Sequence, residues 1–189
     1  MEKKVELTRD LLCESFIELM KIHPFEKITI KMITDGAGVI RPTFYNYYQD
    51  KIEILHYIVE NRLFSQLRDL VNTNMGKEAF KMLFYKIDSE EEFYRNAFSI
   101  SENNYFLDIF IEKIRELIMQ FFKNMHTKNI INDISIETVS KYYALSLTSI
   151  IHYWLTETDH KVSGDELYKA YEFFLTNSIV DIIEQKKLS

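Results

Sequence analysis

The chain has 189 residues, which is enough for one large domain or for a small domain joined to a larger one. Hydrophobic residues make up 47% of the chain and charged residues 28%, a balance that excludes an intrinsically disordered protein, and only 4 Gly and 2 Pro favour helices over turn-rich β-structure. The net charge of −6 by itself speaks against nucleic-acid binding. Whether one part of the chain could still bind DNA depends on how the charges are distributed along it.

The first helix is predicted over residues 4–22, where apolar residues recur at helical spacing. It should end before Pro24, because the residue that precedes a proline avoids the α region. Cys13 lies within the apolar pattern, so we interpret it as a core residue, and as the only cysteine it excludes an internal disulfide. Thr29 is placed to cap a short helix over residues 30–36.

Targeting and metal-binding signals are missing from the sequence. The first ten residues are charged and lack the apolar segment of a secretory signal, and the apolar run over residues 142–155 is too short and too polar to span a bilayer. We therefore expect a cytoplasmic protein with no membrane partner. The five histidines show no paired spacing on one helix face, so we also expect no metal site and no cofactor.

A helix-turn-helix is predicted from the next segment. Gly36-Ala37-Gly38 indicates a turn, and Pro42 suits the first turn of another short helix, where its missing N–H costs nothing. Two short helices joined by such a turn place the second helix in the DNA major groove. Residues 1–51 carry no net charge, residues 21–51 alone carry +2, and the remaining 138 residues carry the whole −6. This distribution is compatible with DNA binding through the N-terminal end alone.

Six further helices are predicted beyond this head. Asp50, Ser89 and Ser163 are each followed three positions later by Glu, the pattern of a capping box at a helix start. The predicted helices cover residues 50–73, 77–87, 90–100, 104–125, 135–156 and 164–186. We therefore expect an all-α protein of about nine helices, with a helix-turn-helix domain over residues 1–50 and a larger helical body over residues 51–189.

The segment GVIRPTFYNYY, residues 38–48, divides by the direction in which its side chains should face. Val39 and Phe44 should pack inward together with Ile33, and Tyr48 fits the core better than a contact surface. The remaining side chains should face outward: Arg41, Pro42, Thr43, Tyr45, Asn46 and Tyr47. Arg can contact guanine, Thr a thymine methyl group and Asn adenine, while Tyr hydroxyls suit phosphate oxygens.

A wider pattern surrounds this segment. A leading amphipathic helix is followed at fixed spacing by Phe25, Ile28-Thr29-Ile30, Ala37-Gly38-Val39, Thr43-Phe44-Tyr45, Tyr48 and Lys51. In this combination residues 8–55, about a quarter of the chain, resemble the N-terminal DNA-binding domain of TetR-family transcriptional regulators. The resemblance implies an all-α fold with an N-terminal three-helix head and a body that binds an effector and forms a dimer.

The resemblance also implies roles for single residues. The residues at base-contacting or base-proximal positions are Arg41, Pro42, Thr43 and Asn46. Tyr45, Tyr47 and Lys51 match positions that contact phosphate. Thr29 and Lys31, directly before and in the first short helix, match positions that contact a phosphate or a base edge. The alternative is that the two tyrosines are packing residues and Lys31 a solvated charge. Ile40 stands where the family often has a serine that caps the recognition helix, so that cap should be missing.

A homodimer is expected, because a single head makes few phosphate contacts and such heads usually bind a palindrome in pairs ~34 Å apart. The family resemblance implies the same and places the interface in the last two long helices. The candidate interface residues are Ile151, Trp154, Tyr171, Phe174, Leu175, Ile179 and Ile182. The alternative is that some of them belong to the core of the monomer.

The middle helices enclose an effector pocket in TetR relatives. The candidate lining residues are Phe84, Phe98, Phe106, Phe110, Tyr143 and His152, although the same rings could simply form a helical core. The segment over residues 93–98, with Tyr142-Tyr143 and Trp154, is similar to a Firmicutes branch of the family that includes regulators of dihydroxyacetone kinase operons. That branch contains an activator that works through a partner protein.

Three functions can be weighed on this basis. The sequence favours a dimeric, sequence-specific DNA-binding regulator, a repressor released by an unknown small-molecule effector. The alternative is a helical adapter or ligand-binding protein, or an activator acting through a partner, with weak or no DNA binding of its own; the net acidity and Ile40 motivate it. An enzyme is disfavoured, because the sequence has no G-x-S-x-G motif, no Gly-rich phosphate loop and no zinc motif.

Overall fold

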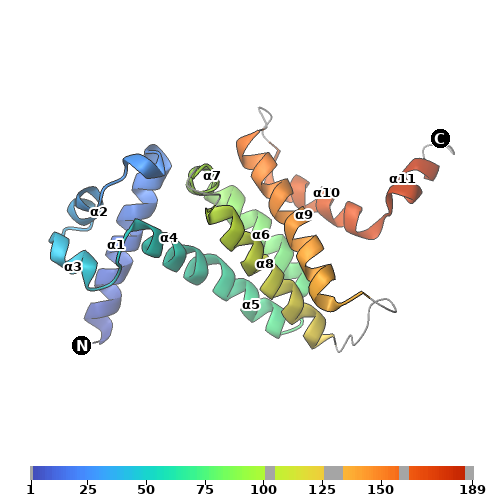
Figure 1. Cartoon of the computed structure of the whole chain (residues 1–189), viewed down its shortest axis with the longest axis horizontal. Coiled ribbons are helices and arrows are strands. Elements are labelled where there is room, and N and C mark those ends of the chain that lie inside the picture. The colour runs from blue at the N-terminus through green and yellow to red at the C-terminus, as the bar shows by residue number, and fades with distance from the viewer. Residues whose placement is uncertain (1, 101–104, 126–133, 158–161, 186–189) are drawn as a thin grey trace.

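The computed structural model describes residues 2–100, 105–125, 134–157 and 162–185, and every regular element in those ranges is a helix. Figure 1 shows a small N-terminal head beside a larger bundle. The head consists of α1 (Glu2–Ile22), the 3-10 turn η1 (Phe25–Lys27), α2 (Ile30–Gly36) and α3 (Arg41–Tyr45). Among the described residues, no helix is both long and apolar enough to cross a lipid bilayer.

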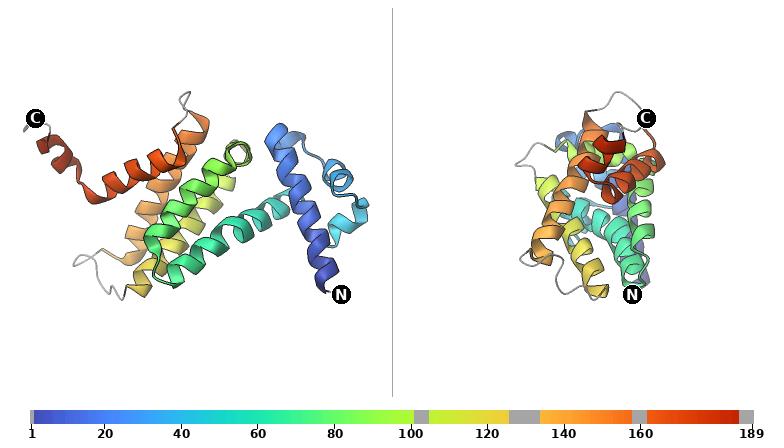
Figure 2. Two further views of the ribbon diagram at one scale, coloured as in Figure 1. Left: turned by 180° about the vertical axis from the view of Figure 1, so that it is seen from behind. Right: turned by 90° about the vertical axis from the view of Figure 1, so that its right-hand side faces the viewer.

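A continuous helical rod leads from the head into the body. It consists of α4 (Lys51–Val59), a π-helical segment η2 (Glu60–Phe64) and α5 (Ser65–Asn72), which follow one another without a break (Figures 1 and 2). The single helix predicted over residues 50–73 is therefore confirmed as one rod. The π-helical segment in its middle was not predicted, and such segments are often found at functional sites.

The body is formed by the elements that follow the rod. They are α6 (Gly76–Ser89), α7 (Glu91–Phe98), α8 (Tyr105–Asn124), α9 (Ile136–Thr156), α10 (Gly164–Thr176) and α11 (Ile179–Gln185). Helices α8 and α9 pack along each other, α10 packs on α6, and α1 of the head packs on α7. The prediction of one last helix over residues 164–186 is wrong, because Asn177 has extended backbone angles (φ −126°, ψ 131°) that end α10.

Most of the predicted helix caps are present. The Thr29 hydroxyl accepts from the backbone N–H of Met32 at 3.2 Å, and Ser163 and Glu166 form a complete capping box. Asp50 accepts from two backbone N–H groups at the start of α4. The cap predicted at Ser89 is wrong, because Ser89 is the last residue of α6 and α7 begins without a side-chain cap.

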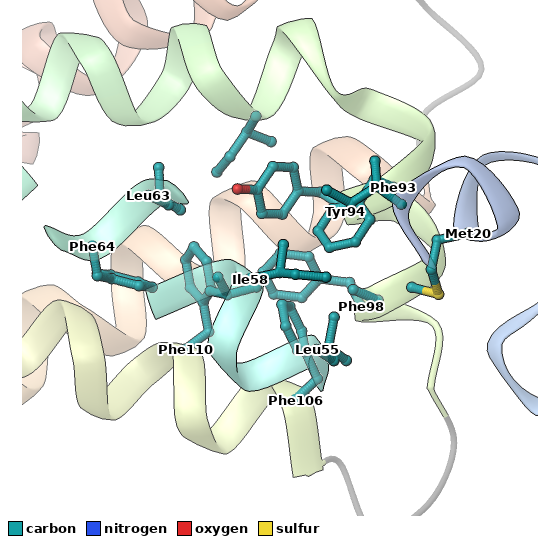
Figure 3. Packing of buried hydrophobic residues seen from close by; sticks show 14 of the residues in the cluster. Met20, Leu55, Ile58, Leu63, Phe64, Phe93, Tyr94, Phe98, Phe106 and Phe110 are labelled. Atoms are coloured by element: carbon teal, nitrogen blue, oxygen red, sulfur yellow. The ribbon is translucent and has the colours of Figure 1, made fainter. Parts of the chain in front are cut away.

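Aromatic rings from three parts of the chain meet in the core of the body (Figure 3). The ring centroid of Phe98 lies 5.0 Å from those of both Phe106 and Phe110, and Phe110 lies 5.2 Å from Phe64 in the rod. Leu55 of α4 is buried beside the same rings. Edge-to-face contacts of this kind stabilise a core beyond the area that they bury. The rod is thus fixed to the body by its own apolar face.

Candidate nucleic-acid interface and ligand cavity

The helix-turn-helix is held by a small apolar core and a glycine turn. Ile33 and Phe44 are completely buried, which confirms their predicted inward direction. Gly38 has φ +66°, a conformation that glycine adopts without steric cost. A Cβ atom on Gly36 would lie 2.3 Å from Ser15 Oγ, so this glycine allows α2 to approach α1 closely. Tyr48 is buried as expected, with its hydroxyl 3.3 Å from Cys13 Sγ.

The start of α3 is exposed at the outer edge of the head. Arg41, Pro42 and Asn46 are exposed and Thr43 is half-buried. Arg41 Nη2 donates to the Tyr45 hydroxyl at 3.0 Å, so these two side chains form one polar group at the surface. Helices α2 and α3 lie on the side of the head that faces away from the body (Figure 1). The structure thus brings together the residues predicted to contact bases.

The first short helix contributes two predicted contacts at the same surface. Lys31 is exposed and its Nζ lies 2.6 Å from Asp35 Oδ2, one helical turn away. An exposed pair of this type is weak, so Lys31 can exchange Asp35 for a phosphate at little cost. Thr29 is exposed while its hydroxyl caps α2. A phosphate at Thr29 would therefore meet the N-terminal end of a helix, which favours anions.

Two predicted DNA contacts point toward the protein instead. Tyr47 is half-buried, and the guanidinium carbon of Arg9 lies 5.5 Å from the centre of its ring. Lys51 Nζ donates to the backbone carbonyls of Phe25 at 2.7 Å and Ile28 at 3.3 Å. Lys51 therefore satisfies carbonyls at the end of η1 and fixes the entry to α2. Phosphate contacts by these two side chains stay predictions.

A cavity of about 430 Å³ lies where the head meets the rod and α8. Of the predicted pocket residues, Phe106 and Phe110 line it and Phe98 packs behind them. The ring centre of His152 lies 5.9 Å from that of Phe98, and Phe84 packs against Tyr168 and Tyr171 of α10. Tyr143 is half-buried on α9, and neither it nor Phe84 nor His152 lines the cavity.

The polar lining of this cavity was not predicted from the sequence. It includes Arg9 from α1, His56 from α4, Glu60 from η2 and Lys113 from α8. Burial lowers the pKa of His56, which favours the neutral imidazole. Burial would raise the pKa of Glu60, but hydrogen bonds from Arg68 and Lys113 outweigh it and lower that pKa. The cavity therefore contains charged groups of both signs beside aromatic rings.

The predicted interface residues divide between the core and the surface. Ile151, Trp154 and Tyr171 are buried within the monomer, and Trp154 Nε1 donates to the carbonyl of Val162 at 2.8 Å. Phe174 and Leu175 are exposed, Ile182 is half-buried, and the side chain of Ile179 lies outside the described residues. Further exposed apolar side chains lie on the same helices and on α11: Tyr142, Leu145, Tyr153, Phe173, Val180 and Ile183.

The body of the chain matches a known protein family. Residues 76–177, more than half of the chain, match the TetR-type model described as the transcriptional regulator C-terminal region. The chain belongs to the TetR family. It is therefore a helix-turn-helix transcriptional regulator and not an enzyme, and the family resemblance seen in residues 8–55 is confirmed by an independent part of the chain.

This TetR-family chain is similar to the HTH-type dhaKLM operon transcriptional activator DhaS of Lactococcus lactis subsp. lactis strain IL1403. The two are 24% identical over 171 residues, which cover 89% of this chain and 87% of that one. A solved structure of the dihydroxyacetone kinase operon activator DhaS has a TM-score of 0.66 at 23% identity and covers 89% of this chain and 92% of that one. The TetR-family repressor FadR of Thermus thermophilus, solved in complex with lauroyl-CoA, has a TM-score of 0.66 at 20% identity and covers 90% of this chain and 95% of that one. At these identities the structural likeness shows the all-α TetR fold alone.

Proposed function

We propose that this TetR-family regulator is a homodimer that binds a palindromic DNA site with two heads, and that it is a repressor released by a small-molecule effector. Residues 1–50 are the DNA-binding part, and residues 51–189 bind the effector and form the dimer. The observation that carries the proposal is the exposure of Arg41, Pro42 and Asn46 in and directly after α3, a helix on the side of the head away from the body. Residues at this position of a recognition helix contact base edges.

The exposed apolar face of the last helices supports the dimer. Phe174 is 60% exposed on α10, which extends from the body on the side away from the head (Figure 1), and Tyr153 is 61% exposed on α9. Large apolar side chains gathered on the surface mark a protein–protein contact. A second copy of the chain fits this face, because two-fold pairing through it leaves both heads at the outside, where each can enter a major groove.

The cavity supports an effector. Its volume of about 430 Å³ lies within the range of small-molecule sites, and it touches the head, the rod and α8 together. A ligand there can change the angle between head and body, and through it the distance between the two heads of a dimer. The FadR relative was solved in complex with lauroyl-CoA, and this supports the proposal that a protein of this fold holds a small organic ligand.

An activator is the second candidate function, because the DhaS relative is described as a transcriptional activator. A reporter gene behind the native promoter distinguishes the two functions. Deletion of the regulator should raise expression for a repressor and lower it for an activator. Purified protein and labelled promoter DNA test the DNA-binding step directly: the shift should weaken steeply with salt, and no specific shift at low salt would overturn the proposal.

A further inference from the structure

The cavity is lined by residues of both the head and the body. Arg9 and Tyr47 line it from the head, His56 lines it from α4, and Phe106 and Phe110 line it from α8. It is therefore open to a ligand that contacts the head and the body at once. The chemical class of that ligand can be inferred from the lining atoms for which the described residues offer no ion pair or hydrogen bond.

Arg9 brings a positive charge to the cavity from α1 of the head. Its guanidinium carbon lies 5.0 Å from the ring centre of Tyr57 and 5.5 Å from that of Tyr47, so two rings hold it in place. In the described part of the chain, no carboxylate oxygen lies within ion-pair distance of Arg9, and its Nε is buried without a hydrogen-bond partner. A hydrogen bond with Tyr57 raises the pKa of Arg9, so the group stays charged.

The acidic groups in the lining already have partners. Glu60 forms ion pairs with Arg68 and with Lys113, whose Nζ lies 2.8 Å from its Oε2. Glu53 Oε2 accepts the backbone N–H of Gln49 at 2.5 Å. Neither carboxylate forms an ion pair with Arg9, so the guanidinium is left to pair with an anion at the head-facing end of the cavity.

A second polar atom in the lining also lacks a partner. His56 Nε2 is buried and makes no hydrogen bond with any described residue, while its ring stacks on Tyr105 at 5.3 Å between centroids. Burial lowers the pKa of His56, so its neutral ring can donate or accept one hydrogen bond. Buried groups of this kind are normally satisfied in proteins, and a bound ligand satisfies them.

We propose that the cavity binds a compact organic anion, a carboxylate or a phosphate monoester, whose anionic group pairs with Arg9 while its apolar part packs on Phe106 and Phe110. His56 Nε2 makes a hydrogen bond to the same ligand. The anion would thereby tie α1 of the head to α8 of the body and fix the angle between them. The binding site stands on its own geometry, and only its effect on DNA rests on the proposed function.

The test is titration calorimetry of the full chain with three probes in the absence of DNA: 4-phenylbutyrate, 2-phenylethyl phosphate and the neutral 4-phenylbutanamide. At least one anion should bind with a Kd of about 1 mM or tighter, and the amide should bind at least about tenfold more weakly. The comparison of the two anions shows which headgroup the cavity prefers. Arg9→Gln should weaken the anion to the level of the amide, whereas Arg41→Gln, which changes an exposed arginine outside the cavity, should not.

The proposal is overturned if neither anion binds, if the amide binds as tightly as the anions, or if Arg9→Gln leaves anion binding unchanged. If Arg9→Gln does not fold, the comparison of the anions with the amide on the wild-type chain still tests whether the site requires an anionic group. A separate titration of labelled promoter DNA with and without the bound anion tests the regulatory step. An anion that binds without changing DNA affinity would contradict effector control while leaving the site intact.

Discussion

Asn96 in α7 accepts a hydrogen bond from the backbone N–H of Phe25 at 3.0 Å, although the two residues lie 71 positions apart in the chain. The Nδ2 atom of the same side chain donates to the carbonyls of Met20, at 2.9 Å, and His23. One amide of the body thus holds both the end of α1 and the start of η1. The neighbouring Arg95 donates to the carbonyl of Leu155 at the end of α9, so α7 links the head to α9.

Replacing Asn96 with Ala should loosen the head from the body. The change leaves the backbone groups of Met20, His23 and Phe25 without their partner, so we expect the free energy of unfolding to fall by about 1–3 kcal/mol. Operator affinity should fall as well, because the head loses its fixed orientation. Urea denaturation and fluorescence anisotropy with labelled operator DNA measure the two effects.

Asn124→Ala is the matched control. Asn124 also uses its amide inside the body, where Nδ2 donates to the carbonyl of Val71 at 2.8 Å and Oδ1 accepts from Gln120 at 2.8 Å. It should lower stability by a similar amount without a matching loss of operator affinity. Equal losses of affinity in the two variants would show that Asn96 does not orient the head.

Ile40→Ser should stabilise the head. Ile40 occupies the N-cap position of α3 with extended angles and no side-chain hydrogen bond, and it is 71% exposed, so its replacement loses little buried area. A serine there can accept a backbone N–H, and we expect a gain of about 0.5–2 kcal/mol. Ile22→Ser, at a position that is also 71% exposed, should give no such gain in thermal unfolding. An unchanged or lower unfolding temperature for Ile40→Ser would contradict the missing cap.

His56 should make stability depend on pH. Burial lowers its pKa in the folded chain below the value of 6.5 for an unperturbed histidine, so the unfolded chain binds more protons below about pH 7. Stability should therefore fall as the pH is lowered through 6.5. His56→Phe keeps the ring beside Tyr105 and should remove this part of the dependence. Urea denaturation at pH 7.5 and pH 5.5 measures the loss of unfolding free energy between the two pH values. An equal loss in the wild-type chain and in His56→Phe would exclude His56 as the source of the pH dependence.

Phe174→Asp should separate the dimer. The side chain is exposed in the single chain, so a charge there costs the monomer little but would be buried in the proposed interface. Sedimentation analysis should show a shift to monomer. Ile22→Asp places the same charge on an exposed residue of the head and should leave the dimer intact. If the Phe174→Asp variant is still a dimer, the proposal that α10 forms the interface is contradicted.

The head could be predicted from the sequence in some detail, because its turn, caps and inward residues depend on local spacing. Thr29, Gly38 and Phe44 take the expected positions for this reason. Lys51 shows the limit of such reasoning. Its partners are the backbone carbonyls of Phe25 in η1 and of Ile28 directly after it, and no pattern of side chains in the sequence predicts such partners.

The body was less predictable, because its site combines residues from distant segments. Arg9, His56 and Lys113 each occur in an ordinary helical pattern, and only the fold brings them to one cavity. A bulky apolar residue such as Ile151 fits the sequence pattern of a core and of an interface equally well, and only the structure places it in the core. The break before α11 did have a local signal, since Ser178 Oγ accepts the backbone N–H of Asp181 at 3.1 Å in a capping arrangement.

The most direct test of the account is selection of bound sequences from a random pool of double-stranded DNA. The wild-type chain should enrich an inverted repeat whose half-sites are separated by about one helical turn or a multiple of it. Arg41→Ala should cost about 1–3 kcal/mol and relax the preference at one position of each half-site, while Lys77→Ala in the body should change nothing. Failure to enrich any sequence, or enrichment that Arg41→Ala leaves unchanged, would contradict the claim that the start of α3 reads DNA.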